Sequence, residues 1–255
     1  MRIATWNLDH ASNSSRPISA QIEQIRIINA DVWILTETCE KVDLREDGFS
    51  PVTPQHKNLY GKYWSTIWIK SGWTINNQIS CYDNETAVCA QIQSPSGNRV
   101  IVYGTIITWR DDKGPNKTSP PWTEHMKSII EHSTDWRTIQ DSYPNIPFIV
   151  AGDFNQTRDG STRTYGTNTC REQLGAELTK NKLSCLTTEN FGATGKLRID
   201  PAKGWARNNI DHICVSNKVF RTEYIGAWDH FTEEGKYLSD HNGVYVDLSL
   251  SEAAD

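Results

Sequence analysis

The most constraining feature of the sequence is a repeated arrangement in which a short apolar run ends on an acidic or amide side chain. Such runs close at Asn7, at Glu37 and at Asp153. Short apolar runs of this kind are typical of buried strands, and open α/β sheets build their sites where such strands end. The pattern predicts an α/β protein whose polar strand ends lie close together.

Helical and strand-like segments alternate along the chain. A cap and a first-turn proline at Ser15–Pro17 begin a helix that continues through Ile28, and further helices are expected from Met126 to Ile139 and from about Cys170 to Lys180. The strands that we expect cover residues 2–8, 31–37, 64–70, 86–93, 99–107, 147–153, 183–187, 209–215 and 243–250. We expect those at 64–70, 86–93 and 99–107 to be adjacent and antiparallel. This order favours two packed sheets flanked by helices, in a single domain over residues 1–255.

The composition restricts the classes of protein to which the chain can belong. A hydrophobic content of 37% with ten Trp can build a core without disulfides, and a net charge of -5 argues against a protein that coats DNA. No apolar stretch approaches the roughly 20 residues that cross a bilayer, and no leader pattern opens the sequence. We therefore expect a cytoplasmic protein without a membrane anchor. The six cysteines lack zinc spacing and are expected to be reduced thiols.

Two of the polar strand ends carry carboxylates suited to a hard metal ion. Magnesium sites in proteins use one or two carboxylates and take further ligands from water and substrate phosphate, and Glu37 and Asp9 match this requirement. The sequence contains no cluster of soft ligands for zinc. We expect the cofactor to be Mg²⁺ or Mn²⁺.

The remaining polar ends match the other needs of phosphoryl transfer to water. One group must position and deprotonate the attacking water, and others must stabilise charge on the phosphate oxygens. Asp153 with Asn155 suits the first role, and Asn7 with His241 suits the second. The residues therefore predict a hydrolase of phosphate esters.

Five short motifs occur in order along the chain: Thr5-Trp6-Asn7, Thr36-Glu37, Gly152-Asp153-Phe154-Asn155, Ile210-Asp211-His212-Ile213 and Ser239-Asp240-His241-Asn242. Together they resemble the signature of the endonuclease/exonuclease/phosphatase superfamily, and the resemblance extends over nearly the whole chain. It implies a four-layer α/β sandwich in which two mixed β-sheets pack together between helices. It also implies a metal-dependent phosphoesterase.

The resemblance assigns roles to individual residues. It makes Glu37 the main metal ligand, with Asp9 and Asp240 as additional ones, and it makes Asp211 the residue that fixes the His241 ring. The catalytic residues that it implies are Asn7, Asp153, Asn155, Asp211 and His241. These assignments agree with the roles inferred from the residues alone.

The sequence departs from the superfamily at the end of the central strand, where many members carry His or Tyr. Thr105 occupies the aligned position, with Tyr103 as the alternative if the register differs. A threonine hydroxyl can donate a hydrogen bond to phosphate but cannot act as a general acid near neutral pH. We expect Thr105 to be a substrate-binding residue.

Several basic and aromatic residues are candidates for substrate contacts. Arg158 and Arg163 follow Asn155 and could grip distal phosphates, and Trp205 with Arg207 lies in a basic stretch suited to the rim of a nucleic-acid site. The alternative is that these side chains are solvated loop residues. Nucleic acid is the favoured substrate; small-molecule or lipid-headgroup phosphate esters, and an inactive binding module on the same fold, are the competing hypotheses.

Overall fold

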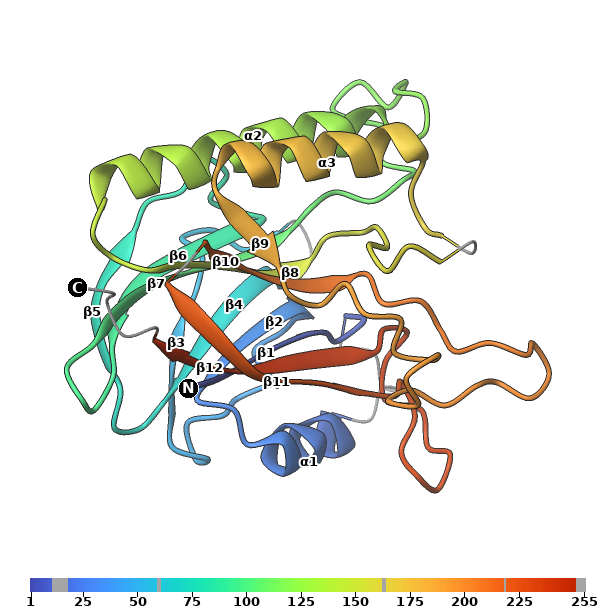
Figure 1. Ribbon diagram of the computed structural model, residues 1–255, viewed down its shortest axis with the longest axis horizontal. Helices are drawn as coiled ribbons and strands as arrows, with labels where there is room; N and C mark the ends of the chain where they lie inside the picture. Colours follow the sequence, from blue (N-terminus) through green and yellow to red (C-terminus); the bar gives the residue numbers. More distant parts are fainter. Residues whose placement is uncertain (11–17, 59–60, 162–163, 218, 251–255) are drawn as a thin grey trace.

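The computed structural model describes residues 1–10, 18–58, 61–161, 164–217 and 219–250, and its strands form two six-stranded sheets (Figure 1). The first sheet has the order β11-β12-β1-β2-β4-β3. Its strands are β1 (Arg2–Asn7), β2 (Val32–Thr38), β3 (Phe49–Val52), β4 (Tyr63–Lys70), β11 (Phe220–Trp228) and β12 (Gly243–Leu250). The central pair β1 and β2 is parallel, and the other neighbours are antiparallel.

The second sheet has the order β5-β6-β7-β8-β10-β9. Its strands are β5 (Thr74–Ile79), β6 (Ala87–Gln93), β7 (Arg99–Ile106), β8 (Phe148–Asp153), β9 (Leu183–Cys185) and β10 (Asp211–Ser216). Here the parallel pair is β7 and β8. Each sheet therefore has one parallel pair at its centre and antiparallel strands on either side.

In the described part of the chain, three helices cover the outer faces of the sheets. Helix α1 (Ile18–Ile28) lies against the first sheet, and α2 (Thr123–Ser142) and α3 (Asn168–Lys180) lie side by side on the second (Figure 1). A parallel strand pair needs a crossover, and α1 and α2 provide the two crossovers. The layers run helix, sheet, sheet, helix, so the predicted four-layer sandwich with two mixed sheets is confirmed.

Alternation along the strands explains the three apolar layers. In β1, Ile3 faces the core between the sheets and Trp6 faces α1; in β8, Ile149 faces that core and Val150 faces α2 and α3. Successive strand residues point to opposite faces, so a strand that is covered on both sides must be apolar throughout. This is the physical reason for the uninterrupted apolar runs in the sequence.

One expectation about strand neighbours was wrong. The strands β6 and β7 do form the expected antiparallel pair, but β4 lies in the other sheet, between β2 and β3. Closeness in sequence cannot distinguish pairing within a sheet from packing across the sandwich. The strands β3, β5 and β11 were not expected, because β5 and β11 are largely exposed and polar and β3 contains Pro51. The expected start of the first helix, Ser15–Pro17, lies outside the described residues.

The polar strand ends gather at one edge of the sandwich. The strands β1, β2 and β8 end there, and the antiparallel strands β10 and β12 begin there, as the register Asp211 opposite Asp153 shows. Within the described ranges, no helix has the length and apolar character needed to span a bilayer.

Candidate active site

Asn7 joins the two sheets at this edge. Its side chain is fully buried, and Nδ2 donates hydrogen bonds to Glu37 Oε1 at 3.0 Å and to Asp153 Oδ2 at 3.0 Å. Asn7 and Asp153 end their strands on the faces that point toward the other sheet, so their side chains meet. One amide therefore holds carboxylates from β2 and β8 together.

The backbone around Asp153 is shaped by the glycine before it. Gly152 has a φ of +145°, and a Cβ atom there would lie 1.8 Å from the carbonyl oxygen of Thr105, so only glycine fits. Asn155 then turns back, with its backbone N–H 2.8 Å from Asp153 Oδ1 and its Nδ2 3.1 Å from Oδ2. The Asp153 carboxylate is thereby held in one orientation.

Left-handed backbone conformations concentrate at the site. Asp9, His10, Glu37 and Asn155 each have a φ of about +49°. For residues other than glycine this conformation costs on the order of 1–3 kcal/mol, and the surrounding structure must offset that cost. The turns direct the Glu37 and Asn155 side chains toward Asn7 and Asp153.

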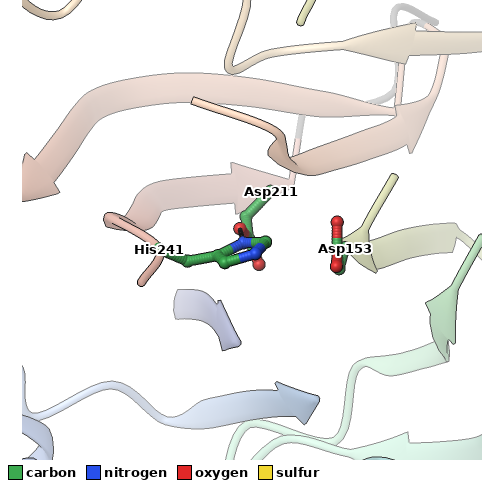
Figure 2. Close-up of side chains that lie close together, drawn as sticks. All are labelled: Asp153, Asp211 and His241. Atoms are coloured by element: carbon green, nitrogen blue, oxygen red, sulfur yellow. Dashed lines mark hydrogen bonds and ion pairs between the residues drawn. The ribbon is translucent and has the colours of Figure 1, made fainter. Parts of the chain in front are cut away.

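A buried pair formed by Asp211 and His241 faces Asp153 (Figure 2). His241 Nδ1 lies 2.6 Å from Asp211 Oδ2, and Asp211 is fully buried at the start of β10. Ser239 supports the pair from the other side, since its hydroxyl donates to the Asn7 carbonyl at 2.6 Å and accepts the His241 N–H at 3.0 Å. The imidazole therefore has a fixed ring orientation and is tied to β1.

The charges of the buried groups depend on one another. Burial raises the pKa of Asp153 to about 8; the charge of Asp211 adds to this rise and that of His241 opposes it. Burial alone would lower the pKa of His241, but Asp211 and Asp153 outweigh it and raise the pKa to about 10. Burial also raises the pKa of Asp211, and the imidazolium opposes that rise. Near neutral pH the site thus contains an imidazolium beside a carboxyl group able to exchange a proton.

Glu37 has a histidine neighbour that the sequence did not reveal. His10 Nε2 lies 2.9 Å from Glu37 Oε2. Burial raises the pKa of Glu37, but the hydrogen bond and charge of His10, together with the Asn7 hydrogen bond, lower it overall. Glu37 is therefore ionised over the physiological range, as a ligand of a divalent cation must be.

The donor set fits a hard divalent cation. Glu37 and Asp240 both line the cavity at the site and offer carboxylate oxygens. Atoms of Asp153, Asp211 and His241 lie within 4.8 Å of one another, and Asp211 Oδ1 is buried without a hydrogen-bond partner among the described residues. The three expected ligands Glu37, Asp9 and Asp240 do not form such a close group, and Asp9 instead accepts a hydrogen bond from the Tyr237 hydroxyl at 2.8 Å.

A cavity of about 1550 Å³ opens over these groups. Seven of the residues expected in the site line it: Glu37, Asp153, Asn155, Asp240, His241, Trp205 and Arg207. Asn7 and Asp211 lie directly beneath, bonded to Asp153 and His241 respectively. The structure thus brings together strand ends and loop residues more than 200 positions apart in the sequence.

Other expected residues lie elsewhere. Thr105 is fully buried on the outer face of β7, where its hydroxyl is 3.2 Å from His132 Nε2, and its neighbour Ile106 lines the cavity instead. Arg158 does not line the cavity and lies against Gly175 of α3. Arg163 falls outside the described residues.

Two residues of the site had no assigned role in the sequence analysis. His10 follows the Thr5–Asp9 segment, but only the left-handed turn at Asp9 brings it back to Glu37. Ser239 lies in a recognised motif beside Asp240 and His241, and that position was the available signal for it. Its two hydrogen bonds depend on tertiary contacts that spacing does not predict.

Comparison with solved structures gives similar folds at low sequence identity. The human Nocturnin catalytic domain with bound sulfate anion is 15% identical with a TM-score of 0.67, covering 98% of this chain and 94% of that one. D. rerio TDP2 complexed with single strand DNA product is 15% identical with a TM-score of 0.65, covering 98% of each chain. The 3′ phosphatase NExo from Neisseria, bound to product DNA hairpin, is 15% identical with a TM-score of 0.67, covering 98% and 99%. These likenesses establish the fold.

The sequence itself matches a family model over nearly its full length. No curated protein sequence matches the chain. The model of the Endonuclease/Exonuclease/phosphatase family matches residues 4–241. This range contains the first four motifs and the fifth motif as far as His241. The chain belongs to the endonuclease/exonuclease/phosphatase family of phosphoesterases.

Proposed function

We propose that the protein is a metal-dependent hydrolase that cleaves phosphodiester bonds of nucleic acid by in-line attack of water. The observation that carries this proposal is the shared cavity: Trp205 and Arg207 line the same space as Asp153 and His241. An aromatic ring and a guanidinium are the groups that bind bases and phosphates in nucleic-acid sites. The DNA products bound to the structurally similar TDP2 and NExo proteins add support.

Asp153 is the proposed base for the attacking water. Burial raises the pKa of its carboxyl to about 8, which is near the pH at which a general base works best. Asn7 and Asn155 orient the carboxylate through the hydrogen bonds described above. In its ionised form, Asp153 would therefore offer a water beside the phosphate a proton acceptor in a fixed position.

His241 is the proposed contact for the scissile phosphate. Its pKa of about 10 keeps the ring cationic, and Asp211 occupies Nδ1. Nε2, which lies 3.8 Å from Asp240 Oδ1, is the nitrogen proposed to face substrate. A cation held in a fixed position stabilises the charge that develops on phosphate oxygens. Asp211 acts through His241 as a positioning residue.

Glu37 would hold Mg²⁺ or Mn²⁺, with Asp240 as an additional ligand. When bound, the cation supplies Lewis-acid stabilisation of charge on the phosphate. Burial raises the pKa of Glu37, but His10 and Asn7 lower it overall. The carboxylate is therefore ionised and able to bind the cation. We do not assign Asp9 to the metal, since Tyr237 engages its carboxylate.

A second candidate function is hydrolysis of a small molecule or lipid headgroup that carries a single phosphate. The observation that favours it is the acidic wall of the cavity, formed by Asp83, Glu85 and Glu131. This wall would repel a long polyanion that extended across it. The two candidates thus differ in the length of substrate that the cavity accepts.

Hydrolysis of substrates of increasing length separates these candidates. We would compare a dinucleotide, single-stranded DNA, duplex DNA, RNA, inositol phosphates and sphingomyelin for kcat/KM. The nucleic-acid proposal predicts higher kcat/KM for single-stranded DNA or RNA than for the dinucleotide. A preference for the dinucleotide, an inositol phosphate or sphingomyelin would overturn it.

Variants of the rim give the matched test. Stacking on an aromatic ring contributes roughly 1–3 kcal/mol per base, so Trp205→Ala should lower kcat/KM on single-stranded DNA about 5- to 150-fold. Arg207→Ala should act in the same direction and reduce the dependence on salt. Arg99→Ala is the control, since it removes an exposed charge at the opposite end of β7. Equal losses for all three variants would contradict the assignment.

A further inference from the structure

A pair of cysteines lies on the outer face of the second sheet, away from the cavity. Cys185 ends the edge strand β9, and Cys214 is its direct register partner on β10. Both are free thiols; Cys214 is fully buried, and Cys185 is partly exposed. Two cysteines that face one another across an antiparallel pair project from the same side of the sheet.

The hydrogen-bond pattern defines the spacing of this pair. Asn217 N–H donates to the Lys182 carbonyl at 2.9 Å, and Leu186 N–H donates to the Ile213 carbonyl at 2.9 Å. Bonded and non-bonded pairs alternate along an antiparallel ladder, so Cys185 and Cys214 form a non-bonded pair, the kind with Cα atoms about 4.5 Å apart. That distance falls at the short end of the roughly 4.4–6.8 Å range that a disulfide bridges.

Positively charged side chains accompany the pair. Arg158 lies close enough to affect the pKa of both thiols, and its Nε is buried with no hydrogen-bond partner among the described residues. A buried N–H of a guanidinium is costly without an acceptor. Hydrogen bonding to Cys214, opposed by burial, and the charges of His212 and Arg158 lower the pKa of Cys185 well below its ordinary value. A thiolate at Cys185 therefore has cationic neighbours.

A second pair of thiols in the same sheet has the opposite surroundings. Burial and the Cys81 thiol raise the pKa of Cys89 well above its ordinary value, and Asp135 adds to the rise. Register places Ile79, not Cys81, opposite Cys89. The Cys185–Cys214 pair does not form a metal site with His212, because potential ligand atoms of these three residues do not cluster within 4.8 Å of one another in the described part of the chain.

We propose that Cys185 and Cys214 form a modification site at which a hydroperoxide generates a reversible disulfide between β9 and β10. The Cys185 thiolate attacks the distal peroxide oxygen, which breaks the O–O bond, gives a sulfenic acid and releases the alcohol, or water from hydrogen peroxide, after protonation. The Cys214 thiol then attacks the Cys185 sulfur, forms the S–S bond and releases water. The two thiols lose two electrons and the peroxide gains them.

The disulfide would lie on the strand that begins with Asp211, three residues farther along the chain. His212, next to Asp211, is held by the Thr187 hydroxyl at 3.0 Å and by the Gln156 carbonyl at 2.9 Å. Thr187 follows Cys185 closely, and Gln156 follows Asn155 directly. The modification site is therefore joined by hydrogen bonds to segments that carry the catalytic candidates, although it does not depend on the proposed function.

Peptide mapping without reduction tests the proposal on the intact protein. The folded chain is treated with an equimolar amount of hydrogen peroxide, the remaining thiols are alkylated, and linked peptides are identified by mass spectrometry. We expect a Cys185–Cys214 link that dithiothreitol reverses, with Cys39, Cys81, Cys89 and Cys170 alkylated. Absence of the link while the protein remains folded, or an equal or greater yield of a Cys81–Cys89 link, would overturn the proposal.

Single variants separate the two roles. In Cys214→Ser, a dimedone adduct should appear at Cys185, because the sulfenic acid has lost its partner thiol; in Cys185→Ser, Cys214 should stay unmodified. Arg158→Ala should slow the reaction of Cys185 about fivefold or more, whereas Arg99→Ala should leave it unchanged. An adduct at Cys214 in Cys185→Ser, or an unchanged rate in Arg158→Ala, would contradict the mechanism.

Discussion

The Nδ1 atom of His241 lies 2.6 Å from a carboxylate oxygen of Asp211, a residue thirty positions earlier in the chain. Both side chains are buried, and they face Asp153 across the site (Figure 2). A buried carboxylate is costly unless it is paired, and an imidazole needs a partner to fix its ring orientation, so each residue meets the requirement of the other. The proposed mechanism treats them as one unit.

A double-mutant cycle tests this unit. Asp211→Asn and His241→Ala should each lower kcat/KM by roughly 10²-fold or more, and the double variant should be little worse than His241→Ala alone, because members of a catalytic unit are strongly non-additive. Thermal melts would verify that all variants are folded. Losses that multiply in the double variant would show independent roles and would remove Asp211 from the proposed unit.

Asp153→Asn should reduce kcat by roughly 10²-fold or more, the range typical of a positioned acid or base. The amide keeps the shape of the side chain but cannot accept a proton from water. KM should stay within about threefold, since the proposed role is in the chemical step. Asp141→Asn, at an exposed position of α2, is the control. A normal kcat with a raised KM would make Asp153 a binding residue.

Glu37→Gln should weaken binding of the divalent cation, because it removes the main proposed carboxylate ligand. Activity should fall at low Mg²⁺ and recover in part when Mg²⁺ is raised about 100-fold or more, because loss of a group that only supports a ligand already costs about 10- to 100-fold in metal affinity. Mn²⁺ binding measured by calorimetry gives a readout independent of turnover. Glu46→Gln, on an exposed loop, should behave as wild type. An unchanged affinity for Mn²⁺ would contradict the role of Glu37.

Stability should depend on pH through His132. Burial lowers the pKa of this imidazole from 6.5 to about 4 in the folded protein. Between these values the unfolded chain binds a proton and the folded chain does not, so stability falls as pH drops from 6.5 to about 4 and this contribution levels off below. The full loss is roughly 3 kcal/mol. Urea unfolding of wild type and His132→Gln across this range checks it, and identical pH slopes would contradict it.

The sequence predicted the layers of the fold and the residues at the strand ends. Asn7 and Asp153 follow apolar runs whose ends must meet in a layered α/β protein, so local pattern was sufficient for them. The pairing of β4 was not predictable, because β4 is equally apolar whether it joins β2 or β6. Packing across the sandwich decides which sheet β4 joins, and the sequence of β4 does not reveal that packing.

The residues hardest to place were those whose position depends on strand register or on a tight turn. Thr105 and Ile106 are neighbours in β7, so Thr105 points to the outer face of the sheet and Ile106 points to the cavity. An error of one residue in the expected register therefore selects the wrong residue for the site. His10 reaches Glu37 only because the backbone turns in a left-handed conformation, which the residue types there did not predict. Trp205 and Arg207, by contrast, line the cavity, and their contact with substrate stays a prediction.

Hydrolysis of a chromogenic phosphodiester, bis(p-nitrophenyl) phosphate, by the intact protein with Mg²⁺ and with excess EDTA tests the proposed activity most directly. We expect turnover with Mg²⁺ that EDTA abolishes and that added Mg²⁺ or Mn²⁺ restores. In Asp153→Asn this turnover should be at least about 10²-fold weaker. Full turnover in EDTA would contradict the metal assignment. Absence of turnover with every divalent cation in well-folded protein would contradict the hydrolase and leave a binding module on the same fold.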